Sequence, residues 1–169
     1  MNLTTHLTEK KPAILGRWLT IVFESYPPET AIFLQKEKDR FDNPVGFRIS
    51  QGMEGLYNSL IQDFDRERVL AFLDEVIRIR ALQNFTPSQA LAFIFLLKNV
   101  IREELADEIG KENLGGEVLE LESRIDGLAL LGFDVYTKRQ EKLCEIRVDE
   151  IKRKISGLMR KAGIEGDSL

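Results

Sequence analysis

The sequence contains only one cysteine and one histidine in 169 residues, and this scarcity excludes several kinds of site. A disulfide framework needs at least two cysteines, and protein zinc sites take several Cys or His ligands. The paired Glu-x-x-His motifs of di-iron bundles, a Gly-rich phosphate loop and a plausible Ser-His-Asp triad are also missing. We therefore predict no metal, no cofactor and no enzyme activity.

Long hydrophobic runs are missing as well. The longest, Ala90 to Leu97, has eight residues, whereas a membrane-spanning helix needs about 20. The first 12 residues are polar and contain no apolar segment typical of a signal peptide. The net charge of −4 gives no general case for nucleic-acid binding. We expect a cytoplasmic protein that does not insert into membranes and does not bind nucleic acid.

The residues that are present are typical of a helical protein. Only five prolines interrupt the chain, and apolar residues recur at steps of three and four. This pattern predicts an all-α bundle of about six helices, over Ala13–Tyr26, Glu29–Arg40, Val45–Asp63, Arg66–Leu82, Pro87–Ile109 and Glu117–Ala162. We place Ile32 and Phe33 of the second helix inward, and Phe64 on the inward stripe that ends the third.

The helix that starts at Pro87 has the clearest start signal. Thr86 and Gln89 have the spacing of a capping box, and proline suits the first helical position. Because the stretch Ala90 to Leu97 is apolar on every side, we expect this helix to be the buried centre of the core.

The last helix changes character near Thr137. Before it the apolar stripe is wide, and Leu130, Leu131 and Phe133 add to its width. Beyond it the apolar residues form a single seam with coiled-coil steps, made of Cys144, Val148, Ile151, Ile155 and Leu158. We therefore divide the chain into a bundle over residues 1–136, a projecting, coiled-coil-like exit helix over 137–162, and a frayed tail over 163–169.

The exit helix is basic, whereas the remainder of the chain is acidic. Residues 137–162 hold nine Lys or Arg against four Asp or Glu, a net charge of +5, so the other residues sum to −9. A narrow seam with charged flanks predicts pairing with another chain, and Ile151→Asp with Ile155→Asp should then give monomers. The alternative is a surface helix that folds back on its own domain. Cys144 is either a small buried seam residue or a redox-sensitive link to a second copy.

Five residues are candidates for a small pocket that binds an anionic ligand. Arg78, Arg80 and Lys98 lie in apolar surroundings, and Trp18 and Tyr57 would supply aromatic walls. The alternative is that the long side chains pack their stems and pair with acids such as Glu75. The single histidine, His6, lies in the polar start of the chain and has no carboxylate at a suggestive spacing, so we expect no ligand role for it.

Several short stretches, in their order along the chain, resemble a known family. They are Gly16-Arg17-Trp18, Tyr26-Pro27-Pro28, Asn43-Pro44-Val45-Gly46, Arg78-Ile79-Arg80-Ala81, Phe85 to Ala90, Phe95 to Lys98, and Phe133-Asp134-Val135-Tyr136. Together they resemble the N-terminal domain of RsbRD-type proteins, from about residue 11 to 155.

The resemblance implies a globin-like, haem-free sensory bundle of the kind found in RsbR-type stress-response regulators. Such domains dimerise, and their last helix leads into an output domain, usually a STAS domain or sometimes a kinase. This sequence has no output domain after residue 169, so we expect either a free-standing module or part of a longer protein.

The expected function is therefore a non-catalytic sensor that dimerises and signals to a regulatory partner through its last helix. Two alternatives stay open. One is an adaptor that binds a protein constitutively without any ligand, and the other is an enzyme acting on a small anionic molecule through Arg78, Arg80 and Lys98.

Overall fold

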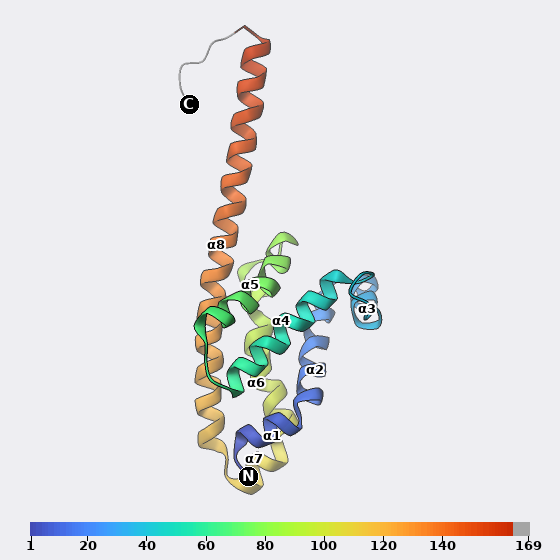
Figure 1. Ribbon diagram of the computed structural model, residues 1–169, viewed down its shortest axis with the longest axis vertical. Coiled ribbons are helices and arrows are strands. Elements are labelled where there is room, and N and C mark those ends of the chain that lie inside the picture. Colours follow the sequence, from blue (N-terminus) through green and yellow to red (C-terminus); the bar gives the residue numbers. More distant parts are fainter. Residues whose placement is uncertain (164–169) are drawn as a thin grey trace. The chain divides into compact units, whose positions relative to one another are not determined.

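The computed structural model describes residues 1–163, and within them every regular element is an α-helix (Figure 1). The helices are α1 (Leu3–Glu9), α2 (Lys11–Glu24), α3 (Pro28–Lys36), α4 (Pro44–Ile61), α5 (Arg66–Leu82), α6 (Pro87–Glu104), α7 (Ala106–Glu112) and α8 (Gly115–Lys161). The predicted all-α class and the long last helix are confirmed. Apart from Gly163, the tail that we expected to fray lies outside the described residues.

Local capping explains where several helices begin. The Thr86 hydroxyl accepts from the Gln89 amide and the Gln89 side chain accepts from the Thr86 amide, which confirms the predicted capping box of α6. Asn43 and Asp65 likewise accept from the first-turn amides of α4 and α5.

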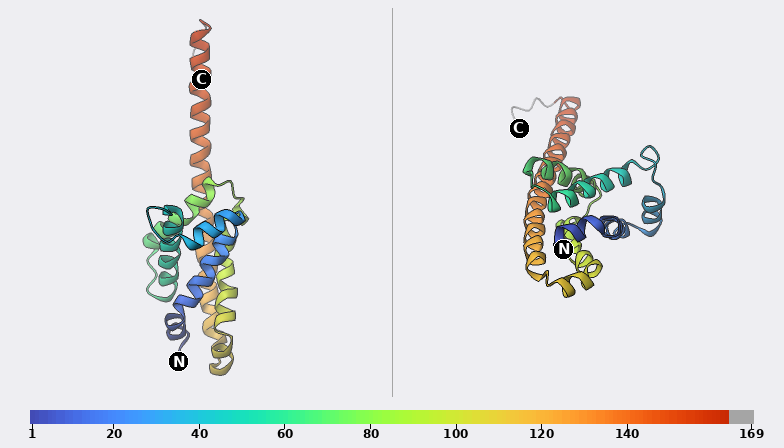
Figure 2. Two further views of the ribbon diagram at one scale, coloured as in Figure 1. Left: turned by 90° about the vertical axis from the view of Figure 1, so that its right-hand side faces the viewer. Right: turned by 60° about the horizontal axis from the view of Figure 1, so that its bottom comes forward.

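Contacts along the chain divide it into two units, Met1–Tyr136 and a second unit that starts at Thr137. The first unit holds one continuous hydrophobic core, in which α2 packs against α6 and α4 against α5 (Figure 2). The early part of α8 belongs to this core, because a Cβ at Gly132 would lie 3.0 Å from Ile94 Cδ1 and 3.3 Å from Ile77 Cδ1. A larger residue at this position would require these isoleucine side chains to shift, so the glycine favours the close approach of α8 to α5 and α6. The two functional domains that we assigned to these ranges stay a prediction.

The first correction concerns the number of helices. The polar start folds as α1, capped by the Asn2 side chain, and the predicted helix over Pro87–Ile109 is interrupted at Leu105. Neither glycine nor proline marks this interruption. Instead, Leu105 is fully buried and Lys10, which lies between α1 and α2, donates a 2.6 Å hydrogen bond to the Glu104 carbonyl. Contacts from Lys10 and the core therefore accompany the end of α6.

The second correction concerns which faces are buried. In α3, Ala31 and Leu34 face the core, whereas Ile32 and Phe33 are about half exposed. The Asn43 amide donates to the carbonyls of Leu34 and Glu37, and these tertiary contacts set the rotation of a helix too short for its periodicity to decide. Phe64, predicted to face inward, is 59% exposed because α4 ends at Ile61.

The predicted central helix α6 is also less buried than expected. Ala90, Leu91, Phe93, Ile94 and Leu97 are buried, but Phe95 is 50% and Leu96 is 36% exposed. Similarly, Leu130 and Phe133 of α8 are exposed rather than part of the core. Among the described residues, no helix is both long enough and apolar enough to cross a membrane.

Candidate functional site

The two aromatic residues of the predicted pocket are buried and hold backbone segments together. Trp18 Nε1 donates a 2.7 Å hydrogen bond to the Phe93 carbonyl, which ties α2 to α6. Tyr57 Oη donates a 2.9 Å hydrogen bond to the Leu7 carbonyl, which ties α4 to α1, and burial raises the pKa of this phenol. Both side-chain donors are therefore used within the protein.

Arg80 is buried, with 2% of its surface exposed, and its partners are backbone and aromatic groups. Its guanidinium donates to the carbonyls of Ala90 and Gln89, at 3.1 and 2.8 Å, and to the Ser25 hydroxyl at 3.1 Å. The guanidinium carbon also lies 4.5 Å from the centre of the Phe85 ring. Burial lowers the pKa of Arg80, and these contacts offset the cost of placing its charge in the core.

The remaining two pocket candidates lie nearer the surface. Arg78 is 3.8 Å from Glu75 on its own helix, and Lys98 Nζ lies 2.5 Å from Asp126 Oδ1 of α8. Of the five candidates, Trp18 and Arg80 lie near one another, since each bonds to the first half of α6. The shared ligand pocket stays a prediction, and each of these contacts favours the structural interpretation.

Two surface grooves of the first unit do not involve any of the five candidates. One, of about 470 Å³, lies between α2, α3 and α4 and includes Leu19, Phe23, Leu34 and Phe47 in its lining. The other, of about 510 Å³, lies beside the end of α4 and includes Phe64, Arg124 and Leu131. Both are open on one side.

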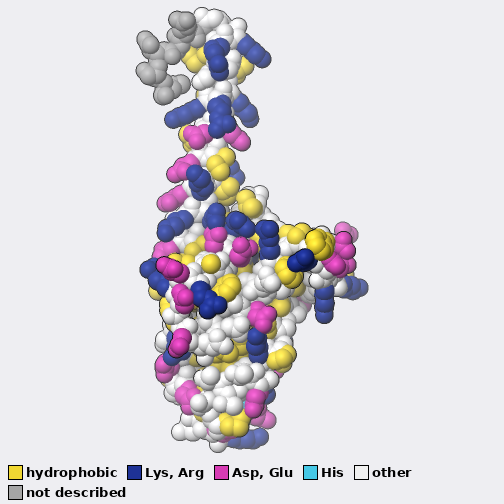
Figure 3. All heavy atoms as spheres, in the orientation of Figure 1, with side chains coloured by type: hydrophobic (Ala, Val, Ile, Leu, Met, Phe, Trp, Pro, Cys, Tyr) yellow, Lys and Arg dark blue, Asp and Glu magenta, His cyan; other side chains and the backbone are white. Residues whose placement is uncertain are grey.

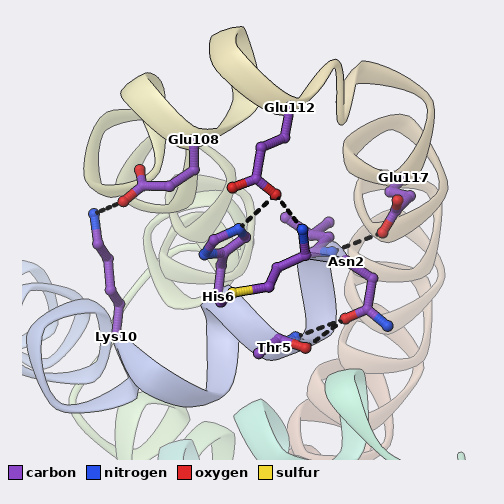
Figure 4. A network of polar contacts seen from close by, with 9 residues as sticks. Asn2, Thr5, His6, Lys10, Glu108, Glu112 and Glu117 are labelled. Atoms are coloured by element: carbon purple, nitrogen blue, oxygen red, sulfur yellow. Dashed lines mark hydrogen bonds and ion pairs between the residues drawn. The ribbon is translucent and has the colours of Figure 1, made fainter.

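His6 has no carboxylate at a suggestive spacing in the sequence, but the fold brings the Glu112 carboxylate close to it (Figure 4). Its Nε2 lies 3.1 Å from Glu112 Oε2, which also accepts a 2.6 Å bond from the amine of Met1. The amine, and then His6, hold the pKa of Glu112 below its usual value, and Lys10 does the same for Glu108.

These contacts join α1 to α7. Among the described residues there is no group of three or more His, Cys, Asp or Glu side chains able to hold a metal ion.

The first unit has an apolar surface on α6 and α8, which we call the α6–α8 face and define as Phe95, Leu130 and Phe133. Their exposed fractions are 50%, 72% and 53%. Large apolar side chains exposed together on two helices are typical of a surface that contacts another protein.

Ion pairs fix the register of the two helices that carry this face. Arg102 forms a two-pronged pair with Glu122, at 2.5 and 2.8 Å, and Lys98 pairs with Asp126. The residue numbers fall by four on α6 as they rise by four on α8, so the helices are antiparallel. The next turn of α6, which holds Ile94 and Phe95, therefore lies beside the turn of α8 that holds Leu130. Since Phe95 shares a stripe with Lys98 and Arg102, and Leu130 with Glu122 and Asp126, the apolar residues continue the charged pairs along one surface.

In the second unit, the predicted seam is helical and exposed. Cys144 is exposed, and the exposed fractions of Val148, Ile151, Ile155 and Leu158 are 43%, 56%, 40% and 66%. Figure 3 shows Lys and Arg side chains along the last turns of α8, with hydrophobic side chains between them. Within the described chain, the seam residues are therefore exposed and accessible to another molecule. Which molecule contacts them stays a prediction.

The sequence contained a signal for the α6–α8 face that the periodicity argument missed. Lys98 and Arg102 follow Phe95 at steps of three and four, which assigns Phe95 to the same side as two charges. Phe95 was instead assigned to the core, because it lies in the continuous apolar run from Ala90 to Leu97.

A comparison with known families identifies the family of this chain. A family model described as the RsbT co-antagonist protein rsbRD N-terminal domain matches residues 12–150. No curated protein and no solved structure matches the chain.

Proposed function

The chain belongs to the family of RsbT co-antagonist protein rsbRD N-terminal domains, and from this premise we propose that it is a non-catalytic regulatory module that dimerises. The family suggests a regulatory sensor-type domain. Our proposal adds that two copies associate through the α6–α8 face and that the last part of α8 conveys the signal to a regulatory partner.

The α6–α8 face is the observation that carries the proposal. Two antiparallel helices expose three large apolar residues on one side and hold each other in register through Arg102–Glu122 and Lys98–Asp126. If a second copy is placed face to face, the two helix pairs form a four-helix arrangement, in which helices bury stripes of this kind. The charged pairs then lie at the end of the buried patch.

The continuity of α8 supports the signalling part of the proposal. One helix, Gly115–Lys161, includes residues of the bundle core and the seam residues of the second unit. A shift of α8 at a dimer interface would change the position or rotation of the seam, which is a two-state element that a ligand or partner can bias. STAS-type or kinase-type partners are the output that the family resemblance implies.

Sedimentation equilibrium tests the dimer. The unmodified chain should have twice the mass of a single chain, and Leu130→Glu with Phe133→Glu should raise the dimer dissociation constant by about 100-fold, because two charges would be buried without partners. Circular dichroism should show an unchanged helix content, since both side chains are exposed in the single chain.

Phe33→Glu with Phe41→Glu is the matched control, because these phenylalanines are 48% and 77% exposed and lie in α3, which contacts α2 and α4, and in the turn after it. This variant should remain dimeric. If the unmodified chain is a monomer, or if the variant with Leu130→Glu and Phe133→Glu remains a dimer, the proposed interface is wrong.

A constitutive adaptor without a ligand is the second candidate, and one observation favours it. The indole of Trp18, the phenol of Tyr57 and the guanidinium of Arg80 all bond to backbone carbonyls, as in a fully packed core. Native mass spectrometry of protein purified from cells distinguishes the two: extra bound mass supports the sensor, and its absence supports the adaptor.

A further inference from the structure

The edges of the seam carry a charge pattern that specifies the kind of partner. The spacing makes Val148 and Ile155 the a positions, and Ile151 and Leu158 the d positions, of two heptads. The residues just before Val148, Ile155 and the next a position, Ala162, are Arg147, Lys154 and Lys161. The residue just after Ile151 is Lys152. From residue 147 to 161, every charge that flanks the seam is therefore positive.

The acidic residues of the same stretch lie elsewhere on the helix. Asp149 and Glu150 follow Val148 by one and two positions, which places both on the side away from the seam. Neither carboxylate is at an edge position where coiled-coil partners exchange ion pairs. The helix therefore presents an apolar stripe between two positive edges.

This pattern opposes pairing with a second copy in either direction. In a parallel pair, an edge residue faces the partner's edge residue five positions further on, so Arg147 would face Lys152. In an antiparallel pair, edge residues of the same kind face each other, which would oppose Arg147, Lys154 and Lys161 with one another. Like charges at these positions select against self-association.

The width of the stripe opposes a lipid surface. Helices that lie on membranes carry a wide apolar face with Trp, Phe or Leu, whereas residues 147–161 hold no aromatic residue and a seam one residue wide. A narrow a/d seam is the surface that fits another helix.

We propose that residues 147–161 of α8 bind an acidic amphipathic helix of another protein, whose Asp or Glu side chains flank its own apolar seam. Four exposed aliphatic residues give the contact, and four cations at the edges select the partner. The inference rests on the proposed function, in which this part of α8 is the output, and it names the chemistry of the output partner. The proposed dimer uses the α6–α8 face of the first unit, which includes none of the seam residues.

The test uses the full chain and two synthetic helical peptides of about four heptads, identical in their Ile and Leu seam but with Glu or Lys at all edge positions. The Glu peptide should bind at least about tenfold more tightly than the Lys peptide, and the difference should shrink when salt rises from about 50 to about 500 mM. Lys152→Glu with Lys154→Glu should abolish this preference, because it leaves two positive and two negative edge residues.

Arg153→Glu with Arg160→Glu is the matched control. It makes the same change in net charge on the outer side of the helix, and the preference for the Glu peptide should persist. If both double variants weaken binding equally, general attraction explains the result and the proposal fails. Equal binding of both peptides, or no binding of either, also overturns it.

Two further measurements separate this inference from other occupants and from the dimer. Preferential binding to phosphatidylserine vesicles or to a labelled DNA duplex, without binding to the Glu peptide, would overturn it. Sedimentation of the same variants reports the dimer: a dimer that fails to bind the Glu peptide contradicts only this inference, whereas a monomer that binds it contradicts only the α6–α8 interface. Loss of the dimer in Ile151→Asp with Ile155→Asp would assign the seam to a second copy.

Discussion

The bundle, Met1–Tyr136, and the segment of α8 from Thr137 onward use the same residue types in opposite ways. In the bundle, Trp18, Ile49 and Leu73 are fully buried, whereas in the second unit Ile151, Ile155 and Leu158 are 40% to 66% exposed. The bundle derives its stability from packing. The described part of the second unit is helical as far as Lys161, and its seam residues are exposed in the single chain, so contact with another chain would bury them.

The polar groups of the bundle and those of the second unit also differ in their partners. Inside the bundle, the donors of Trp18, Tyr57 and Arg80 bond to backbone carbonyls of other helices, so they determine how those helices pack. In the second unit, the ion pair between Lys142 and Glu145 joins exposed residues one turn apart and adds little stability. Charges in the bundle fix its own structure, whereas we propose that the charges beside the seam select a partner.

The largest effect that tests this comparison is expected from Trp18→Ala. The substitution removes a fully buried indole and leaves the Phe93 carbonyl without its 2.7 Å donor. We expect the free energy of unfolding to fall by about 3–5 kcal/mol, as measured by urea denaturation followed by circular dichroism. A loss below about 1 kcal/mol would mean that the core around α2 and α6 is less well packed than the buried fractions indicate.

The sequence predicted the helices better than it predicted their exposed faces. Capping residues and prolines are local signals, so the start of α6 at Pro87 was predictable from Thr86 and Gln89. The interruption at Leu105 is accompanied by a hydrogen bond from Lys10, which is 94 positions away from Glu104, and no local pattern carries that information.

The candidate site shows the same limit. The seam was predictable because its spacing and flanking charges lie on one helix. The α6–α8 face could not be predicted because residues of two helices form it. The apolar residues of each helix, considered separately, have the pattern of core residues. His6 was assigned no neighbour for the same reason, since Glu112 is 106 positions away.

A smaller effect, dependent on pH, is expected from Glu112→Gln. The amine of Met1 and His6 lower the pKa of Glu112 in the folded protein, so this carboxylate stabilises the fold above its unfolded pKa and loses that contribution as the pH falls through its folded pKa. The variant should therefore lose less stability than the unmodified chain on going from neutral pH to about pH 3, because glutamine does not titrate.

The measurement is the urea midpoint of both proteins as the pH falls. Glu24→Gln, which removes an exposed carboxylate at the end of α2, is the control and should lose stability as the unmodified chain does. If the curves of the Glu112 variant and the unmodified chain run parallel, the contact between α1 and α7 contributes nothing to the acid response of the bundle.

The smallest effect is expected from Ile155→Ala in the second unit. The side chain is 40% exposed and alanine favours the helix more than isoleucine does, so the free energy of unfolding of the isolated chain should change by less than about 0.5 kcal/mol. The same substitution should weaken binding of the Glu-edged peptide, because Ile155 lies at the centre of the proposed contact.

This pair of results separates a residue that stabilises the fold from one that serves an interface. If Ile155→Ala instead lowers stability, and lowers it more at high protein concentration, Ile155 is buried between two copies of the chain. The contrast between a packed bundle and an open seam would then hold for one chain but not for its dimer.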